Sequence, residues 1–118
     1  MHRFEELKNW QKAMDIVESC YRVTEDFPIE EKYGLTSQLR RSAVSIPSNI
    51  AEGAGRNTHG EFRQFLGIAN GSSFELLTQL HLSKRLELIK SEEIKSIINQ
   101  VNEVTKMNYS LQQTLIKS

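Results

Sequence analysis

The chain has 118 residues, and its 15 basic and 15 acidic side chains cancel to a formal net charge of zero. A chain of this length is expected to fold as one domain, residues 1–118, around a single core that needs no disulfide or metal. The balanced charge excludes a global positive field that would attract nucleic acid or anionic lipid, so any basic surface must be local.

A first helix is predicted from about Phe4 to Asp26. Apolar side chains recur there at spacings of three and four, which places them on one helical face. We expect this face to point into the core; its members are Leu7, Trp10, Met14, Val17, Tyr21 and Thr24. Phe27-Pro28 ends the helix, because the residue before a proline is pushed out of the helical conformation.

A connector over residues 30–34, with room for a helical turn of its own, leads to a second helix from about Thr36 to Glu52. Its core face is expected to comprise Leu35, Leu39, Ala43, Ile46 and Ile50. Gly53 and Gly55 end the helix, since glycine readily takes the left-handed cap conformation. Pro47 cannot donate to the carbonyl of Ala43, so we predict a kink there, with Ser42, Ser45 or water binding the freed carbonyl.

Thr58 and Glu61 form a capping box that opens a third helix, predicted to end near Leu88. Its core face is expected to comprise Phe62, Phe65, Leu66, Ala69, Ser73, Leu76, Leu77 and Leu80. A fourth helix is predicted to begin after Ser91 as its N-cap. It carries a heptad seam with one polar member, namely Ile94, Ile97, Val101, Val104, Asn108, Leu111 and Leu115. The fold class is therefore all-α, an antiparallel up-down-up-down four-helix bundle with a kink at Pro47.

The second and third helices carry apolar residues away from their core faces. These predict a subunit interface made of Arg40, Val44, Pro47, Ala51, Ile68, Glu75, Leu82 and Leu86. A helix that is apolar nearly all round is buried on more than one side, and here the extra side most plausibly faces another copy of the chain. The alternative is scattered surface apolar residues, which are normal. Glu75 is expected to be partly buried and paired with Arg40 or Arg41, and Gly67 and Gly71 suggest close helix approach.

The spacing of the candidate residues argues against several kinds of catalytic or metal site. None of the three histidines has a glutamate three residues before it, so the di-iron motif of helical bundles is missing. The glycine-spaced run from Gly55 to Gly60 lacks the lysine and hydroxyl residue of a phosphate loop. We therefore expect no catalytic residues, no metal, no cofactor and no enzymatic activity. With one cysteine (Cys20, expected to be buried), no apolar run of roughly 18 residues and no signal segment at the N-terminus, a cytoplasmic protein without membrane contact is expected.

A local basic surface is the remaining candidate for a ligand site. No acidic residue occurs from Tyr33 to Ala51, whereas Arg40 and Arg41 lie there and Arg56 and Arg63 follow. These four arginines are the candidate nucleic-acid contacts, especially if an oligomer repeats them around a ring. The alternative is a solvated helix face whose arginines pair with neighbouring acids.

The run from Leu39 to Gly53, LRRSAVSIPSNIAEG, strongly resembles the four-helix-bundle proteins encoded in intervening sequences of bacterial 23S ribosomal RNA genes. The resemblance covers essentially the whole chain, including Phe4, Leu7, Trp10 and Ala13, Phe27-Pro28, Glu61-Phe62, Phe65-Leu66 and the segment from Gly71 to Leu80. It implies an antiparallel bundle that assembles as a homopentamer, with no catalytic residues to carry over. A related protein, the accessory variability determinant of diversity-generating retroelements, is a basic pentamer that binds nucleic acid and its reverse transcriptase.

Two functions follow from these observations. The first is a non-enzymatic homo-oligomer associated with ribosomal RNA or another nucleic acid, which the resemblance implies. The second is an oligomeric scaffold that binds a protein partner and makes no nucleic-acid contact. The zero net charge departs from the basic relative and counts against strong, sequence-independent binding of nucleic acid.

Overall fold

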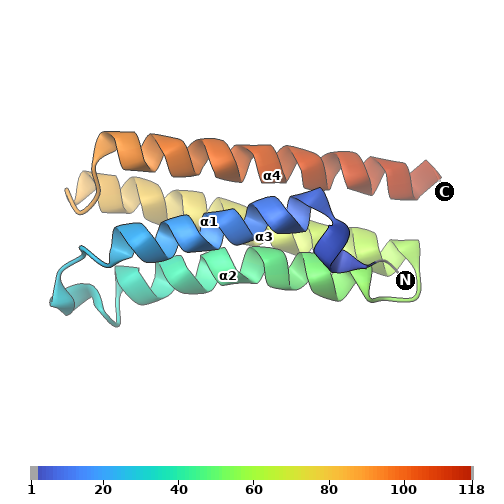
Figure 1. Cartoon of the computed structure of the whole chain (residues 1–118), viewed down its shortest axis with the longest axis horizontal. Coiled ribbons are helices and arrows are strands. Elements are labelled where there is room, and N and C mark those ends of the chain that lie inside the picture. Colours follow the sequence, from blue (N-terminus) through green and yellow to red (C-terminus); the bar gives the residue numbers. More distant parts are fainter. Residues whose placement is uncertain (1–2, 118) are drawn as a thin grey trace.

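A computed structural model describes residues 3–117, and these form four long α-helices and two short 3₁₀ turns, with no strand (Figure 1). The helices are α1 (Lys8–Thr24), α2 (Leu35–Ala54), α3 (His59–Arg85) and α4 (Ser91–Lys117). The turns are Phe4–Glu6, before α1, and Ile29–Glu31, in the connector to α2. The predicted all-α bundle is confirmed.

The helices pack side by side in an elongated bundle of 47 × 22 × 20 Å. α1 and α3 each pack directly against both α2 and α4, while the backbones of the diagonal pairs, α1 with α3 and α2 with α4, stay more than 8 Å apart between Cα atoms among the described residues. Chain direction reverses at each connection, as the colours of Figure 1 show. Two hydrogen bonds between α3 and α4 agree with this antiparallel order: Arg63 bonds to Leu115, and the later residue Asn70 bonds to the earlier residue Thr105.

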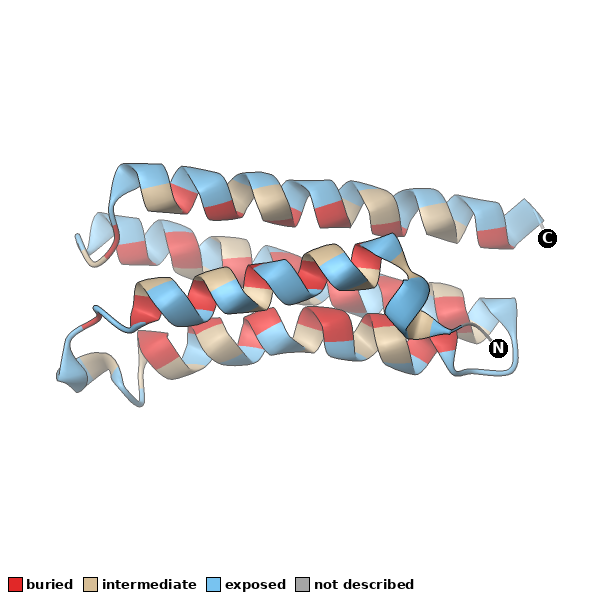
Figure 2. Cartoon of the chain, viewed as in Figure 1, coloured by how far each residue is buried: buried red, intermediate tan, exposed pale blue. Residues whose placement is uncertain are grey.

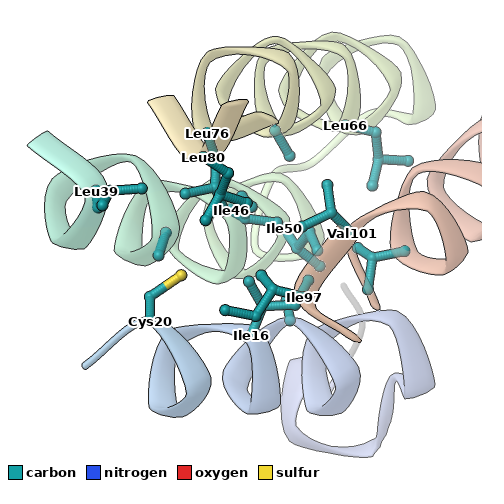
Figure 3. Packing of buried hydrophobic residues seen from close by; sticks show 14 of the residues in the cluster. Ile16, Cys20, Leu39, Ile46, Ile50, Leu66, Leu76, Leu80, Ile97 and Val101 are labelled. Carbon is teal, nitrogen blue, oxygen red and sulfur yellow. The ribbon is translucent and has the colours of Figure 1, made fainter. Parts of the chain in front are cut away.

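The core runs the length of the bundle and draws on all four helices (Figures 2 and 3). The predicted core face of α2 is confirmed, since Leu35, Leu39, Ala43, Ile46 and Ile50 are all buried. The heptad seam of α4 is buried at every predicted position except Leu111, which is half-buried. Among the predicted core residues of α3, only Phe65 and Leu77 remain half-buried.

The predicted core face of α1 is wrong by one position. The side chains that α1 buries are Asn9, Ala13, Ile16, Cys20 and Thr24. Of the predicted face, only Thr24 is buried; Leu7, Trp10 and Val17 are half-buried and pack against the edge of the core, whereas Met14 and Tyr21 are about two-fifths exposed, at 39% and 42%. The helix has two neighbouring apolar stripes, and the stripe with Ala13, Ile16 and Cys20 faces the core. The larger side chains lie on the flank of the bundle.

Helix ends follow local capping chemistry. The Glu31 carboxylate accepts the backbone N–H of Leu35 at 3.1 Å and caps α2, whose N-cap residue is a glycine. Thr58 accepts the N–H of Glu61 at 3.1 Å, which confirms the predicted cap of α3. α4 begins at Ser91, one residue earlier than predicted, and the Glu93 carboxylate accepts the N–H of Lys90 at 3.4 Å.

α3 ends at Arg85, three residues before the predicted end near Leu88. The sequence contains no glycine or proline at this turn, so the earlier end could not be predicted from it. The N–H of Leu88 donates to the Ser83 carbonyl and that of Glu87 to the Lys84 carbonyl, the pair of bonds that closes a helix with a left-handed residue. Glu87 is that residue, with φ of 61°. The turn carries Ile89 back into the core, where it is 8% exposed.

Pro47 lies inside α2, which continues as one helix from Leu35 to Ala54. The kink stays a prediction. The two serine hydroxyls expected near the freed carbonyl of Ala43 have other partners: Ser42 donates to Glu75 at 2.6 Å, and Ser45 lies 2.8 Å from Ser72. Both hydroxyls therefore join α2 to α3.

Candidate assembly surface

The flank of the bundle between α1 and α2 is apolar and hollow. A hollow of about 310 Å³ is lined by Trp10, Met14, Val17, Val44, Pro47, Ser48 and Ala51. Val44 is 40% exposed, while Pro47 is already buried within the single chain at the floor of the hollow. The larger stripe of α1 and the second apolar stripe of α2 thus form one surface, which we call the α1–α2 face.

A second hollow, of about 470 Å³, continues this face towards the connector between α1 and α2. It shares Val44 with the first hollow, and its lining includes Tyr21, Tyr33, Arg40 and Arg41. Arg40 is held by its own chain: its Nε donates to the Thr24 hydroxyl at 2.8 Å, and its guanidinium stacks 4.5 Å from the centre of the Tyr21 ring. Arg41 is exposed, and residues 3–117 contain no ion pair that involves either arginine.

α3 presents a separate row of exposed side chains, Ile68, Glu75, Leu82 and Leu86, which we call the α3 ridge. Ile68 and Leu82 are each 45% exposed, and Leu86 is 53% exposed. The ridge follows the α2 side of α3, because Glu75 and the neighbouring Ser72 both bond to α2. The predicted interface residues are therefore divided between two faces, on either side of α2.

Glu75 differs from its prediction. It is exposed, and its hydrogen-bond partner is the hydroxyl of Ser42, with no basic side chain paired to it among the described residues. The predicted close approach at Gly67 and Gly71 is also missing within the chain. A Cβ at Gly71 would meet nothing within 4 Å, and one at Gly67 would meet only the Gln112 side chain at 3.5 Å.

Close approach occurs instead at Gly53, at the end of α2. A Cβ there would lie 2.7 Å from the Cβ of Phe65 and 3.0 Å from the Phe62 ring. Since real Cβ atoms do not come this close, the glycine allows α2 and α3 to converge where their connection begins.

The four candidate arginines do not form one patch. Arg40 and Arg41 lie towards the α1–α2 connector, and Arg56 follows Arg41 by fifteen residues, or about 22 Å along a helix. Arg56 is paired with Glu52 at 3.0 Å and stacks 4.8 Å from the centre of the Phe65 ring. Arg63 donates to the carbonyl of Leu115 at 3.3 Å. Three of the four guanidinium groups therefore have partners within the chain.

Metal-binding clusters and the single cysteine were the remaining features to place. Residues 3–117 contain no group of three or more histidine, cysteine or carboxylate side chains that could hold a metal ion. Burial raises the pKa of the Cys20 thiol from 9.0 to about 12, so the thiol stays protonated and is a poor nucleophile. No helix in the described part of the chain is long and apolar enough to cross a membrane.

Sequence reasoning missed the contribution of α1 to this surface. It assigned Trp10, Met14, Val17 and Tyr21 to the core because they recur at spacings of three and four. The signal that could have separated the two stripes is the second series Ala13, Ile16 and Cys20, offset by one position. Two offset series on a short helix indicate burial on two sides.

Fold and surface together define a small all-helical bundle protein with apolar faces that its own chain does not cover. The family model described as 23S rRNA-intervening sequence protein matches residues 5–110, and the chain belongs to this family.

A solved structure supports the same relationship. The chain is similar to a protein with unknown function from the S23 ribosomal protein family of Bacteroides thetaiotaomicron, known from its crystal structure. The two are 25% identical, the match covers 88% of this chain and 97% of the other, and the TM-score is 0.79. No curated protein matches the chain.

Proposed function

We propose that the protein is a non-enzymatic helical bundle that acts as a homo-oligomer. The observation that carries this proposal is the pair of uncovered apolar surfaces, the α1–α2 face and the α3 ridge. A monomer would leave side chains such as Val44, Ile68, Leu82 and Leu86 40% to 53% exposed. Groups of exposed apolar side chains on neighbouring helices are typical of protein interfaces.

The arrangement of the two surfaces favours a ring. A two-fold dimer buries the same patch on both subunits, so it would cover only one of the two surfaces. A head-to-tail contact pairs the α1–α2 face of one copy with the α3 ridge of the next and covers both. The two surfaces lie on either side of α2. When such a ring closes, the side of α2 that faces away from the bundle core therefore points towards the ring axis. The family resemblance implies five copies.

What the oligomer binds is the second part of the proposal. The dispersed and paired arginines support a scaffold that binds a protein partner, since a strong phosphate site needs several cations together. One observation favours nucleic acid as the second candidate. Arg41 is exposed and carries no ion pair among residues 3–117, and a ring would bring one copy of it from each subunit towards the axis.

Light scattering tests the assembly. We expect a mass that is a multiple of 13.6 kDa at micromolar concentration, whereas a mass of one chain would defeat the proposal.

A salt titration with structured RNA separates the two candidate functions. Binding through Arg41 should weaken steeply between 50 and 200 mM salt, roughly the range over which phosphate contacts are screened. Arg41→Ala should flatten that dependence, measured at a protein concentration at which light scattering shows that the variant is still assembled. Arg22→Ala is the matched control, because Arg22 is exposed but already paired with Glu18 at 3.3 Å. If the protein binds no structured RNA even at low salt, the nucleic-acid function is excluded and the protein-binding scaffold is the remaining proposal.

A further inference from the structure

We infer that the two surfaces meet in one particular register, with Glu75 of one copy in the basic hollow formed by Arg40 and Arg41 of the next. The partner is thus a second copy of this chain, joined head to tail. This inference rests on the proposed self-assembly and adds the residues that pair across the contact.

Charge complementarity is the first argument. The basic hollow holds two guanidinium groups, and no ion pair within residues 3–117 involves them. The α3 ridge carries one carboxylate, Glu75, between apolar neighbours, and its partner within the chain is a neutral hydroxyl. A carboxylate that enters an apolar contact needs a cation opposite it, since an unpaired charge there is costly. The hollow of the next copy offers both guanidinium groups, with Lys32 at the same hollow.

Height along the bundle is the second argument. If the ring axis runs parallel to the long axis of the bundle, a given residue lies at the same position along that axis in every copy. The 2.6 Å bond between Ser42 and Glu75 places these two residues at the same height on α2 and α3. Arg41 and Arg40 precede Ser42 by one and two residues, or about 1.5 and 3 Å. They therefore lie level with Glu75 of the neighbouring copy.

The apolar hollow falls into the same register. Ile68 precedes Glu75 by seven residues, which moves it about 10 Å along α3 towards the α2–α3 connection. Pro47 and Ala51 follow Ser42 by five and nine residues on the antiparallel α2, or about 7.5 and 13.5 Å in the same direction. Ile68 therefore comes level with the floor of the apolar hollow, between these two residues.

The opposite end of the ridge also has an uncovered counterpart. Leu82 lies on the last turn of α3 and Leu86 is the first residue after the helix, near the end of the bundle that carries the α1–α2 connector (Figure 1). That connector holds the two most exposed large apolar side chains of the described residues, Ile29 at 76% and Tyr33 at 87%. In this register an apolar contact, the charged contact of Glu75 and a second apolar contact follow one another along the bundle. A shift by one helical turn would instead place Glu75 against Val44.

Charge reversal tests the pair. Glu75→Arg, or Arg40→Glu with Arg41→Glu, should raise the concentration at which the oligomer half-dissociates by about tenfold or more, because like charges then face each other. Reversing both sides in one chain should restore the starting value. Glu92→Arg is the control for an exposed carboxylate on α4 that has no ion pair among residues 3–117, and circular dichroism verifies that each variant folds.

A cross-link tests the distance without relying on charge. Arg41→Cys and Glu75→Cys proteins, mixed under mild oxidation, should give a covalent dimer that neither variant gives alone. Cys20 does not interfere, because it is buried. An intact oligomer with no cross-link and no response to charge reversal overturns the register and leaves self-assembly standing. A monomeric unaltered protein overturns self-assembly itself.

Discussion

Asn108 ties three helices together, and its removal gives a sharp test of how the bundle is held in register. The side chain is fully buried on α4, accepts from the Asn9 amide at 2.8 Å and donates to the Asn70 amide oxygen at 2.9 Å. Asn108→Ala removes both bonds and leaves Asn9, only 4% exposed, without its acceptor. A stranded buried donor costs about 1–3 kcal/mol, and a lost net hydrogen bond adds about 1 kcal/mol.

We therefore expect Asn108→Ala to lower the free energy of unfolding by about 2–4 kcal/mol. Denaturant unfolding at one fixed protein concentration measures this, since assembly makes stability depend on concentration. Asn99→Ala, an exposed change on the same helix, should stay within about 0.5 kcal/mol.

Replacing both partners gives a second outcome. Asn9→Leu with Asn108→Leu removes donor and acceptor together, so it should cost less than the single Asn108→Ala change. The reasoning is refuted if Asn108→Ala costs under about 1 kcal/mol, or if the paired replacement is the more damaging of the two.

Three further predictions concern single residues. Gly53→Ala should destabilise the protein by about 1–3 kcal/mol through its clash with Phe65. Gly67→Ala should stabilise it by about 0.5–1 kcal/mol, because there is room for the methyl group. If chemical unfolding shows a gain in stability from both changes, the close approach at Gly53 is contradicted. Glu87→Gly should raise stability by about 0.5–1 kcal/mol, because glycine takes a φ of 61° without strain, and an unchanged thermal midpoint would argue against strain at this turn. Cys20, whose pKa burial raises from 9.0 to about 12, keeps its proton in the folded chain while the unfolded chain loses it above pH 9. The stability that this provides is complete below pH 9 and lost as the pH rises towards 12, at up to about 1.4 kcal/mol per pH unit; Cys20→Ala should flatten this part of the pH profile, and identical slopes in the two proteins would count against it.

The bundle could be predicted from the sequence where apolar spacing is unambiguous. On α2 and α4 the series with the largest aliphatic side chains is the one that faces the core, and burial follows the predicted positions closely. α1 has two series offset by one position, and spacing alone does not say which of them the neighbouring helices cover. The spacing predicted the series with Trp10 and Met14, yet the series with Ala13 and Ile16 is buried.

The candidate surface was only partly predictable for a similar reason. The second stripes of α2 and α3 were visible as apolar residues off the core face, but their division between two sides of α2 depends on which flank each helix turns to its neighbour. The hydrogen bonds Ser42–Glu75 and Ser45–Ser72 decide this, and neither leaves a mark in apolar spacing. The partners of Arg40 and Arg63 likewise come from other helices, beyond the reach of local pattern.

The most direct test of head-to-tail assembly is the mass formed when two blocked variants are mixed. Val44→Arg blocks the α1–α2 face and Leu82→Arg blocks the α3 ridge, so each protein alone should have the mass of one chain, 13.6 kDa. Tyr109→Arg, a change at an exposed side chain on α4, should leave the oligomer intact.

Mixed together, the two blocked variants each contribute one unaltered surface. Sedimentation equilibrium should then show a complex of one copy of each, twice 13.6 kDa or about 27 kDa. A mixture that stays at the mass of one chain, while the unaltered protein remains oligomeric, would contradict the head-to-tail contact.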